Sequence, residues 1–165
     1  MELLETRVDV DDLDSFLARL DEIGSRHGVT IQAFDARYVA DRRHLERAVA
    51  LADRAVDRGE NVARDRAVEI LLYAAGRRQI DRALEMGLSP GENRAVILIE
   101  GEDEDDALAD LDALEAVVDR EPTLGEYDEE VLCSFFGITD AERAATDATL
   151  EELVRERVAL LEVAK

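Results

Sequence analysis

Apolar residues recur every three or four positions over most of the chain, and this spacing predicts helices. The predicted helices run from a cap at Asp9 or Asp11 to about residue 26, from a cap at Asp41 to about residue 58, over 62–75, 79–86, 103–118 and 129–136, and from a cap at Thr149 toward the C-terminus. Glycines that follow the periodic residues, such as Gly28 and Gly76, are typical of helix C-termini.

Three shorter segments, 2–8, 29–34 and 95–99, are predicted to be strands, and the last is a continuous apolar run that suits a central strand. The order is strand, helix, strand, several helices, strand, several helices. It predicts an α+β or mixed α/β fold in which a small β-sheet is covered by several helices. At 165 residues, we expect a single domain that spans residues 1–165.

The charge of the chain is unusual in kind as well as in amount. Asp and Glu number 41 against 20 basic residues, which gives a formal net charge of −21, and Lys165 is the single lysine. Carboxylates keep proteins soluble in concentrated salt, so we expect a halophile of archaeal type. The alternative is an acidic protein with a basic partner. We found no signal-peptide pattern and no membrane-length apolar stretch, and therefore expect a cytoplasmic protein without membrane contact.

Few residues suggest catalysis or metal binding. Cys133 lies between apolar residues and is expected to be a buried small hydrophobe, and no spacing joins it to His27 or His44 in a zinc site. The acidic run 102–106 lacks the glycine and spaced oxygens of a calcium loop, which favours a solvated helix start. We therefore expect no catalytic residues, no metal and no cofactor. A small carboxylate-based enzyme remains a remote alternative, for which Glu60 and Glu69 would be the acids.

The junction at residues 73–79, sequence YAAGRRQ, carries the candidate chemistry. A helix that ends at Gly76 is followed at once by a second predicted helix, so free backbone N–H groups collect there. Arg77 and Arg78 add bidentate donors, and Gln79 adds an amide able to contact a base edge. Such a junction suits a phosphate or a nucleotide end, and at high salt binding would rest on these direct contacts. The alternative is that the arginines pair with acids and Tyr73 packs in the core.

The same junction lies in a run, EILLYAAGRRQIDRALEMGL at 69–88, that resembles the most characteristic segment of the KEOPS regulatory-subunit family, the family of the kinase-binding protein TPRKB. The family core is E-I-L-L-Y-x-(S/A)-G-x-R-Q-I, followed by A-L-x-x-x-G. Upstream, the segment 31–36 and the R-G-E-N turn at 58–61 also fit. Ala75 stands where the family often has serine, and Arg77 stands at a variable position.

The resemblance implies a non-enzymatic subunit of KEOPS, the complex that makes the threonylcarbamoyl modification of tRNA adenosine. Such a subunit binds the small atypical kinase/ATPase subunit, contacts the remaining subunits indirectly, and helps to recruit tRNA through its 3′ CCA end. The first RNA-contact candidates are Gly76, Arg78 and Gln79. The further candidates are Arg77, Tyr73, Ala75, Arg58 and Asn61.

A kinase partner needs an exposed apolar surface. The last predicted helix offers Val154, Val158 and Leu161 as a candidate stripe, and ordinary core packing of the same residues is the alternative. A pure protein-interaction module that docks the kinase without contacting RNA also remains open.

Overall fold

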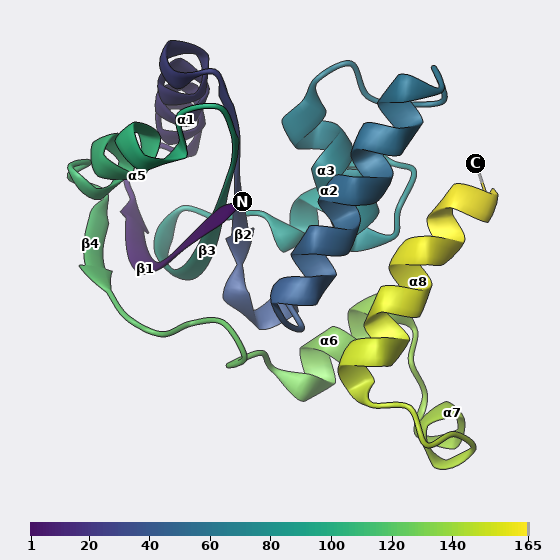
Figure 1. Ribbon diagram of the computed structural model, residues 1–165. Helices are drawn as coiled ribbons and strands as arrows, with labels where there is room; N and C mark the ends of the chain where they lie inside the picture. The colour runs from purple at the N-terminus through teal and green to yellow at the C-terminus, as the bar shows by residue number, and fades with distance from the viewer. Residues whose placement is uncertain (165) are drawn as a thin grey trace. The chain divides into compact units, whose positions relative to one another are not determined.

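The computed structural model describes residues 1–164, and its contacts divide the chain into two compact units (Figure 1). Unit 1 comprises Met1–Ala36 and Gly87–Thr123, and unit 2 comprises Arg37–Met86 and the segment from Leu124 onward. The single domain predicted over residues 1–165 remains a prediction, because a division into contact units does not test it. The predicted combination of a small sheet with several helices is confirmed, which makes the fold α+β.

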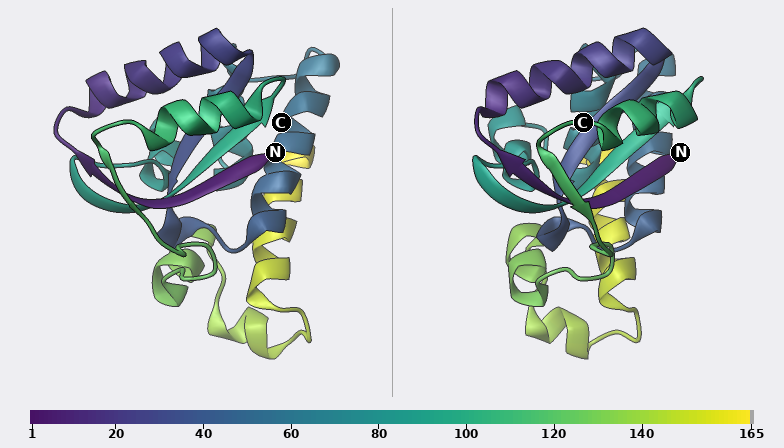
Figure 2. Two further views of the ribbon diagram at one scale, coloured as in Figure 1. Left: turned by 60° about the vertical axis from the view of Figure 1, so that its left-hand side comes forward. Right: turned by 90° about the vertical axis from the view of Figure 1, so that its left-hand side faces the viewer.

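Unit 1 is a four-stranded antiparallel sheet with two helices over one face (Figure 2). Its elements are β1 (Glu2–Val10), α1 (Leu13–His27), β2 (Val29–Asp35), β3 (Gly91–Gly101), α5 (Glu104–Asp112) and β4 (Val117–Arg120). The strand order is β2-β3-β1-β4, so the apolar run predicted as a central strand lies inside the sheet. Alternate side chains of β1, among them Leu4 and Val8, pack in the core beneath α1 and α5.

The predicted helix over 103–118 is wrong in its second half. The helix ends at Asp112, and Val117–Arg120 forms the edge strand β4, which pairs with β1. The leucines continue a helical spacing, but the open edge of β1 offers backbone partners, such as the Asp9 N–H that donates to the Ala116 carbonyl at 2.8 Å. Val118, at the end of the predicted helix, is 47% exposed.

Unit 2 is helical. Its elements are η1 (Ala36–Tyr38), which begins at the last residue of unit 1, and α2 (Arg42–Asp57), α3 (Arg66–Ala75), α4 (Ile80–Ala83), η2 (Leu84–Met86), α6 (Glu129–Phe136), α7 (Asp140–Ala144) and α8 (Leu150–Ala164). Helices α2, α3 and α8 pack on one another. None of the helices within residues 1–164 combines the length and apolarity that a membrane-spanning helix needs.

Most helices begin directly after a residue whose side chain caps the first turn. The Asp41 carboxylate accepts the N–H of His44 at 2.8 Å, and the Thr149 hydroxyl accepts the N–H of Glu152 at 3.2 Å, so both predicted caps are confirmed. The cap of α1 is Asp12 rather than Asp9 or Asp11. Helix α3 begins four residues later than predicted because Asp65 caps it. The short helix α7 was not predicted.

Candidate nucleic-acid interface

The C-terminus of α3 is a glycine-terminated end that carries the predicted junction. Gly76 adopts a left-handed backbone with φ of 61°. Its N–H donates to the Tyr73 carbonyl, and the N–H of Arg77 donates to the Leu72 carbonyl, each at 3.0 Å. This pair of bonds is the Schellman arrangement, which turns the chain sharply and fixes the residues that follow.

The turned segment forms one wall of a groove of about 460 Å³ in unit 2. The other walls are the end of α6 and one side of α8. The groove is lined by Ala75, Gly76, Arg77, Arg78, Gln79, Ser134, Phe135, Phe136, Gly137, Arg157, Leu160 and Leu161. The structure thus brings five of the eight predicted RNA-contact residues to one concave surface.

Two arginines of this groove are held by backbone carbonyls. The Arg77 guanidinium donates to the Phe135 carbonyl and lies over the Phe135 ring, 4.8 Å from its centroid. Arg157 donates to the Phe136 carbonyl at 3.1 Å and to the Gly137 carbonyl at 3.3 Å. Both side chains therefore satisfy carbonyls at the end of α6 that the helix leaves open. They fix the walls of the groove, and Arg157 also forms an ion pair with Glu142 that offsets its charge.

Arg78 and Gln79 are exposed at the mouth of the groove. Gln79 is the N-cap residue of α4, but its side chain makes no capping hydrogen bond, so its amide is not committed to the helix. The predicted helix over 79–86 consists of a four-residue α-helix followed by the 3-10 turn η2. So short a helix has a weak dipole, and the side chains rather than a helix N-terminus supply the polar groups here.

Tyr73 and Ala75 differ from one another in their surroundings. Tyr73 is fully buried in unit 2 and does not line the groove, so its side chain presents no surface to a ligand there. Ala75 is 1% exposed and is among the residues that line the groove.

Arg58 and Asn61 lie in the loop after α2, and neither is among the residues that line the groove. Arg58 forms an ion pair with Glu162 at 3.6 Å, and the Asn61 amide donates to the Ala63 carbonyl at 2.8 Å. Arg58 therefore contacts α8, and Asn61 bonds within the loop, so the structure does not bring these two candidates together with Arg78 and Gln79.

The acidic residue of the motif has a structural role that the sequence did not reveal. Glu69 is fully buried, and its carboxylate accepts the N–H groups of Val62 and Ala63 at 3.1 Å. A buried carboxylate is stable only with such donors. Glu69 thus fastens the loop at 61–63 to α3, which weighs against its use as a catalytic acid with Glu60.

His44 fastens the other end of the same helix. Its ring is fully buried, Nδ1 accepts the N–H of Ala40 at 3.1 Å, and Nε2 lies 2.7 Å from the Ala74 carbonyl, to which it donates. Burial lowers the pKa of His44 from 6.5 to about 4. The neutral imidazole therefore links the start of α2 to the end of α3, one residue before the groove begins.

The candidate kinase stripe on α8 is packed inside unit 2. Val154 and Val158 are fully buried and Leu161 is 4% exposed, so the core-packing alternative describes them. An exposed stripe was required for the docking role, and these side chains do not provide it. Leu160, the neighbouring residue, is 49% exposed and lines the groove.

Cys133 lies in α6 and is partly buried. Burial raises the pKa of the Cys133 thiol, with Arg143 acting in the opposite direction. The thiol is therefore protonated at neutral pH, which does not suit a nucleophile.

The groove also contains residues that the sequence did not bring forward. Phe135, Phe136 and Arg157 stand more than fifty residues from Gly76, and nothing in their local spacing marks them. A weak signal existed, because Gly137 ends a short apolar helix much as Gly76 ends α3. Two glycine-terminated helices facing the same space create the groove.

A family model described as kinase binding protein CGI-121 matches residues 9–162, almost the entire chain. The chain belongs to this family. The match confirms the family that the motif at 69–88 resembles, and it supports a kinase partner. A comparison with curated proteins found no match.

Proposed function

We propose that this kinase-binding protein is a non-catalytic subunit of the KEOPS complex and that its unit 2 groove binds the 3′ CCA end of tRNA. The observation that carries the proposal is the groove of about 460 Å³ in which Gly76, Arg78 and Gln79 face the end of α6. A single-stranded end has unstacked bases, which can lie against arginine planes and receive amide hydrogen bonds.

The charges of the groove support this ligand. Arg77, Arg78 and Arg157 bring three guanidinium groups to one concave surface of a chain whose net charge is −21, and of these Arg157 is ion-paired with Glu142. The Arg77 guanidinium lies over the Phe135 ring, with 4.8 Å between its central carbon and the ring centroid, and a nucleobase could extend this cation–π contact. Leu160 adds an exposed apolar contact at the edge.

The proposed mode of binding suits a salt-rich environment, which the acidic composition favours. At about 1 M salt, attraction between charges fades within about 3 Å, so steering of tRNA by distant charge contributes little. Stacking and short hydrogen bonds persist under these conditions. We therefore place the protein in a halophilic archaeal cytoplasm as part of the same proposal.

Substitution of Arg78 tests the groove, and the chain offers Arg82 as a matched control. Arg82 is also exposed, four residues further along, but does not line the groove. Arg78→Ala is expected to weaken tRNA binding by about 1–3 kcal/mol, roughly 5- to 150-fold, while Arg82→Ala leaves it within about twofold. Equal affinity of the two folded variants for tRNA would show that Arg78 does not contact tRNA.

A second candidate is a protein-interaction module that docks the kinase without touching RNA. The observation that favours it is the engagement of Arg77 and Arg157 by carbonyls of α6, which gives both arginines a structural task. The two candidates separate in one experiment, in which tRNA and the purified kinase subunit are titrated into the same Arg78→Ala protein. Loss of tRNA binding with kinase binding retained supports the first candidate.

A further inference from the structure

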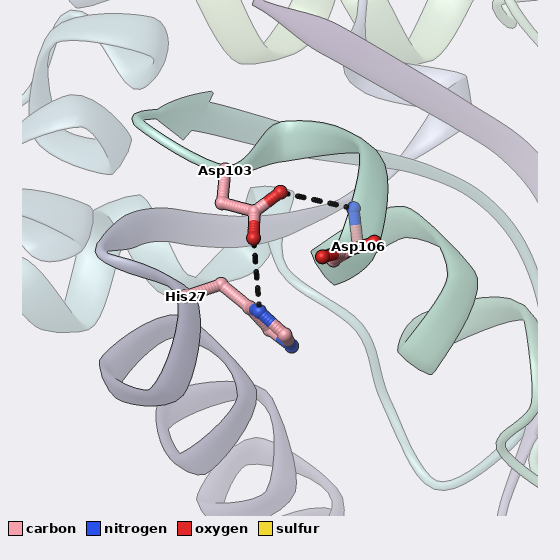
Figure 3. Close-up of side chains that lie close together, drawn as sticks. All are labelled: His27, Asp103 and Asp106. Carbon is pink, nitrogen blue, oxygen red and sulfur yellow. Dashed lines mark hydrogen bonds and ion pairs between the residues drawn. The ribbon is translucent and has the colours of Figure 1, made fainter.

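Unit 1 carries a cluster of metal-ligating side chains that lies outside the groove and plays no part in the proposed function. His27 stands in the last turn of α1, Asp103 is the N-cap of α5, and Asp106 stands in the first turn of α5. The three side chains lie close together (Figure 3), and one potential ligand atom from each lies within 4.8 Å of the others.

The backbone holds these side chains together. The Asp103 N–H donates to the His27 carbonyl at 3.3 Å, and the Glu102 N–H donates to the Gly28 carbonyl at 3.2 Å. Gly28 permits the tight turn with φ of 66°. The end of α1 and the start of α5 are thus fixed to each other by main-chain bonds, so the positions of His27 and Asp103 do not depend on long side chains.

The imidazole lies between two carboxylates in a manner that suggests a cation. Nε2 of His27 is 2.7 Å from Oδ2 of Asp110, and Nδ1 is 3.6 Å from Oδ2 of Asp103. When Nε2 donates its proton to Asp110, a neutral ring turns the lone pair of Nδ1 toward the Asp103 oxygen. The second distance is too long for a hydrogen bond. It is close to the roughly 3–3.4 Å that separates two ligands of one ion bound at about 2.1 Å.

We propose that Nδ1 of His27 and the carboxylates of Asp103 and Asp106 bind a divalent transition-metal ion of the Zn²⁺ class. A nitrogen ligand beside two carboxylates favours Zn²⁺, Co²⁺ or Ni²⁺ over Mg²⁺ and Ca²⁺, which prefer oxygen ligands alone. Asp103 can act as a metal ligand through Oδ2, which faces the His27 imidazole, because the Asp106 N–H is accepted by its other oxygen, Oδ1, at 3.3 Å.

Asp110 completes the arrangement without touching the ion. A carboxylate that accepts the distal N–H of a ligating histidine fixes the tautomer and strengthens the ligand. Arg26 in turn donates to Asp110 at 3.1 Å. Asp110 is thus a positioning residue, and the ion would join the end of α1 to the start of α5.

Calorimetric titration with Zn²⁺ tests the site, in a buffer whose excess Mg²⁺ occupies the diffuse sites of this acidic surface. We expect one Zn²⁺ per chain for the wild type. His27→Gln and Asp106→Asn should each weaken Zn²⁺ binding at least tenfold, and Asp110→Asn about tenfold through the tautomer. Asp105→Asn is the matched control, because Asp105 is exposed in the same acidic run and outside the cluster.

The rival arrangement is an imidazolium held by two carboxylates with no ion. Nitrogen NMR of His27 distinguishes the metal site from this rival arrangement. If the ion binds at Nδ1, added Zn²⁺ moves the Nδ1 resonance while Nε2 stays protonated. Equal Zn²⁺ affinity of the wild type and a folded His27→Gln variant would overturn the proposal, as would an unchanged Nδ1 resonance. Neither result bears on tRNA or kinase binding.

Discussion

Acidification is predicted to destabilise the protein through His44. The ring is fully buried, and its Nδ1 can accept the Ala40 N–H only while the imidazole is neutral. The folded pKa of about 4 lies below the ordinary 6.5, so the unfolded chain takes up a proton first as the pH falls. The stability from this group is therefore complete above pH 6.5 and is lost as the pH drops toward 4.

The magnitude follows from the two pKa values. Each pH unit below 6.5 costs about 1.4 kcal/mol until the folded pKa is reached, which gives about 1.4 kcal/mol at pH 5.5 and about 3 kcal/mol in total. The hydrogen bond lost on protonation is the one that Nδ1 accepts from the Ala40 N–H, so the loss falls on the start of α2, whereas Nε2 still donates to the Ala74 carbonyl.

Urea unfolding at pH 7.5, 6.5 and 5.5 measures the effect in the wild type and in His44→Gln. The glutamine variant should be less stable by about 1–3 kcal/mol at pH 7.5, because buried hydrogen bonds are lost. Its free energy of unfolding should fall less between pH 7.5 and 5.5 than that of the wild type. His27, whose pKa is raised by its bond to Asp110, changes the free energy of unfolding with pH in the opposite direction. It does so equally in both proteins, so its effect cancels when they are compared. The same pH dependence in both proteins would refute the reasoning.

Three further predictions concern stability and are checked by thermal or urea unfolding. Gly76→Ala should cost about 1–2 kcal/mol from the left-handed backbone, with an added contact of 3.3 Å to the Arg157 carbonyl. Gly59→Ala has a similar φ without that contact and should cost less; equal losses would argue against the contact. Glu69→Gln should cost about 1.5–3 kcal/mol and the exposed Glu60→Gln almost nothing, and equal effects would contradict the loop-fastening role. Val158→Asp should leave little folded protein, since it buries an unpaired charge, and a folded variant would place Val158 at the surface.

The sequence predicted the helices whose ends are marked by capping residues. Asp41, Gly28 and Gly76 act through hydrogen bonds within a few residues, so each helix end could be recognised locally. Strand β4 could not, because it is four residues long, only Val117 of it is buried, and it depends on the free edge of β1. The leucine spacing before it continued a helical pattern and concealed the change.

The candidate site was predictable only in part, for a similar reason. Gly76, Arg78 and Gln79 stand in one turn, and their chemistry is visible in seven consecutive residues. The opposite wall, with Phe135 and Arg157, comes from helices far along the chain and needs the packing of unit 2 to reach the same space. Helical spacing alone could not decide whether the apolar face of α8 is a docking stripe or core, since both use the same residues.

The most direct test of the central claim is the affinity of this protein for tRNA with and without its CCA end, measured by filter binding in molar KCl. We predict that removal of the CCA end weakens binding at least tenfold, and that Arg78→Ala binds the two tRNAs nearly alike. Equal affinity of the wild-type protein for both tRNAs would contradict end recognition by the groove and leave the kinase-docking module as the better account.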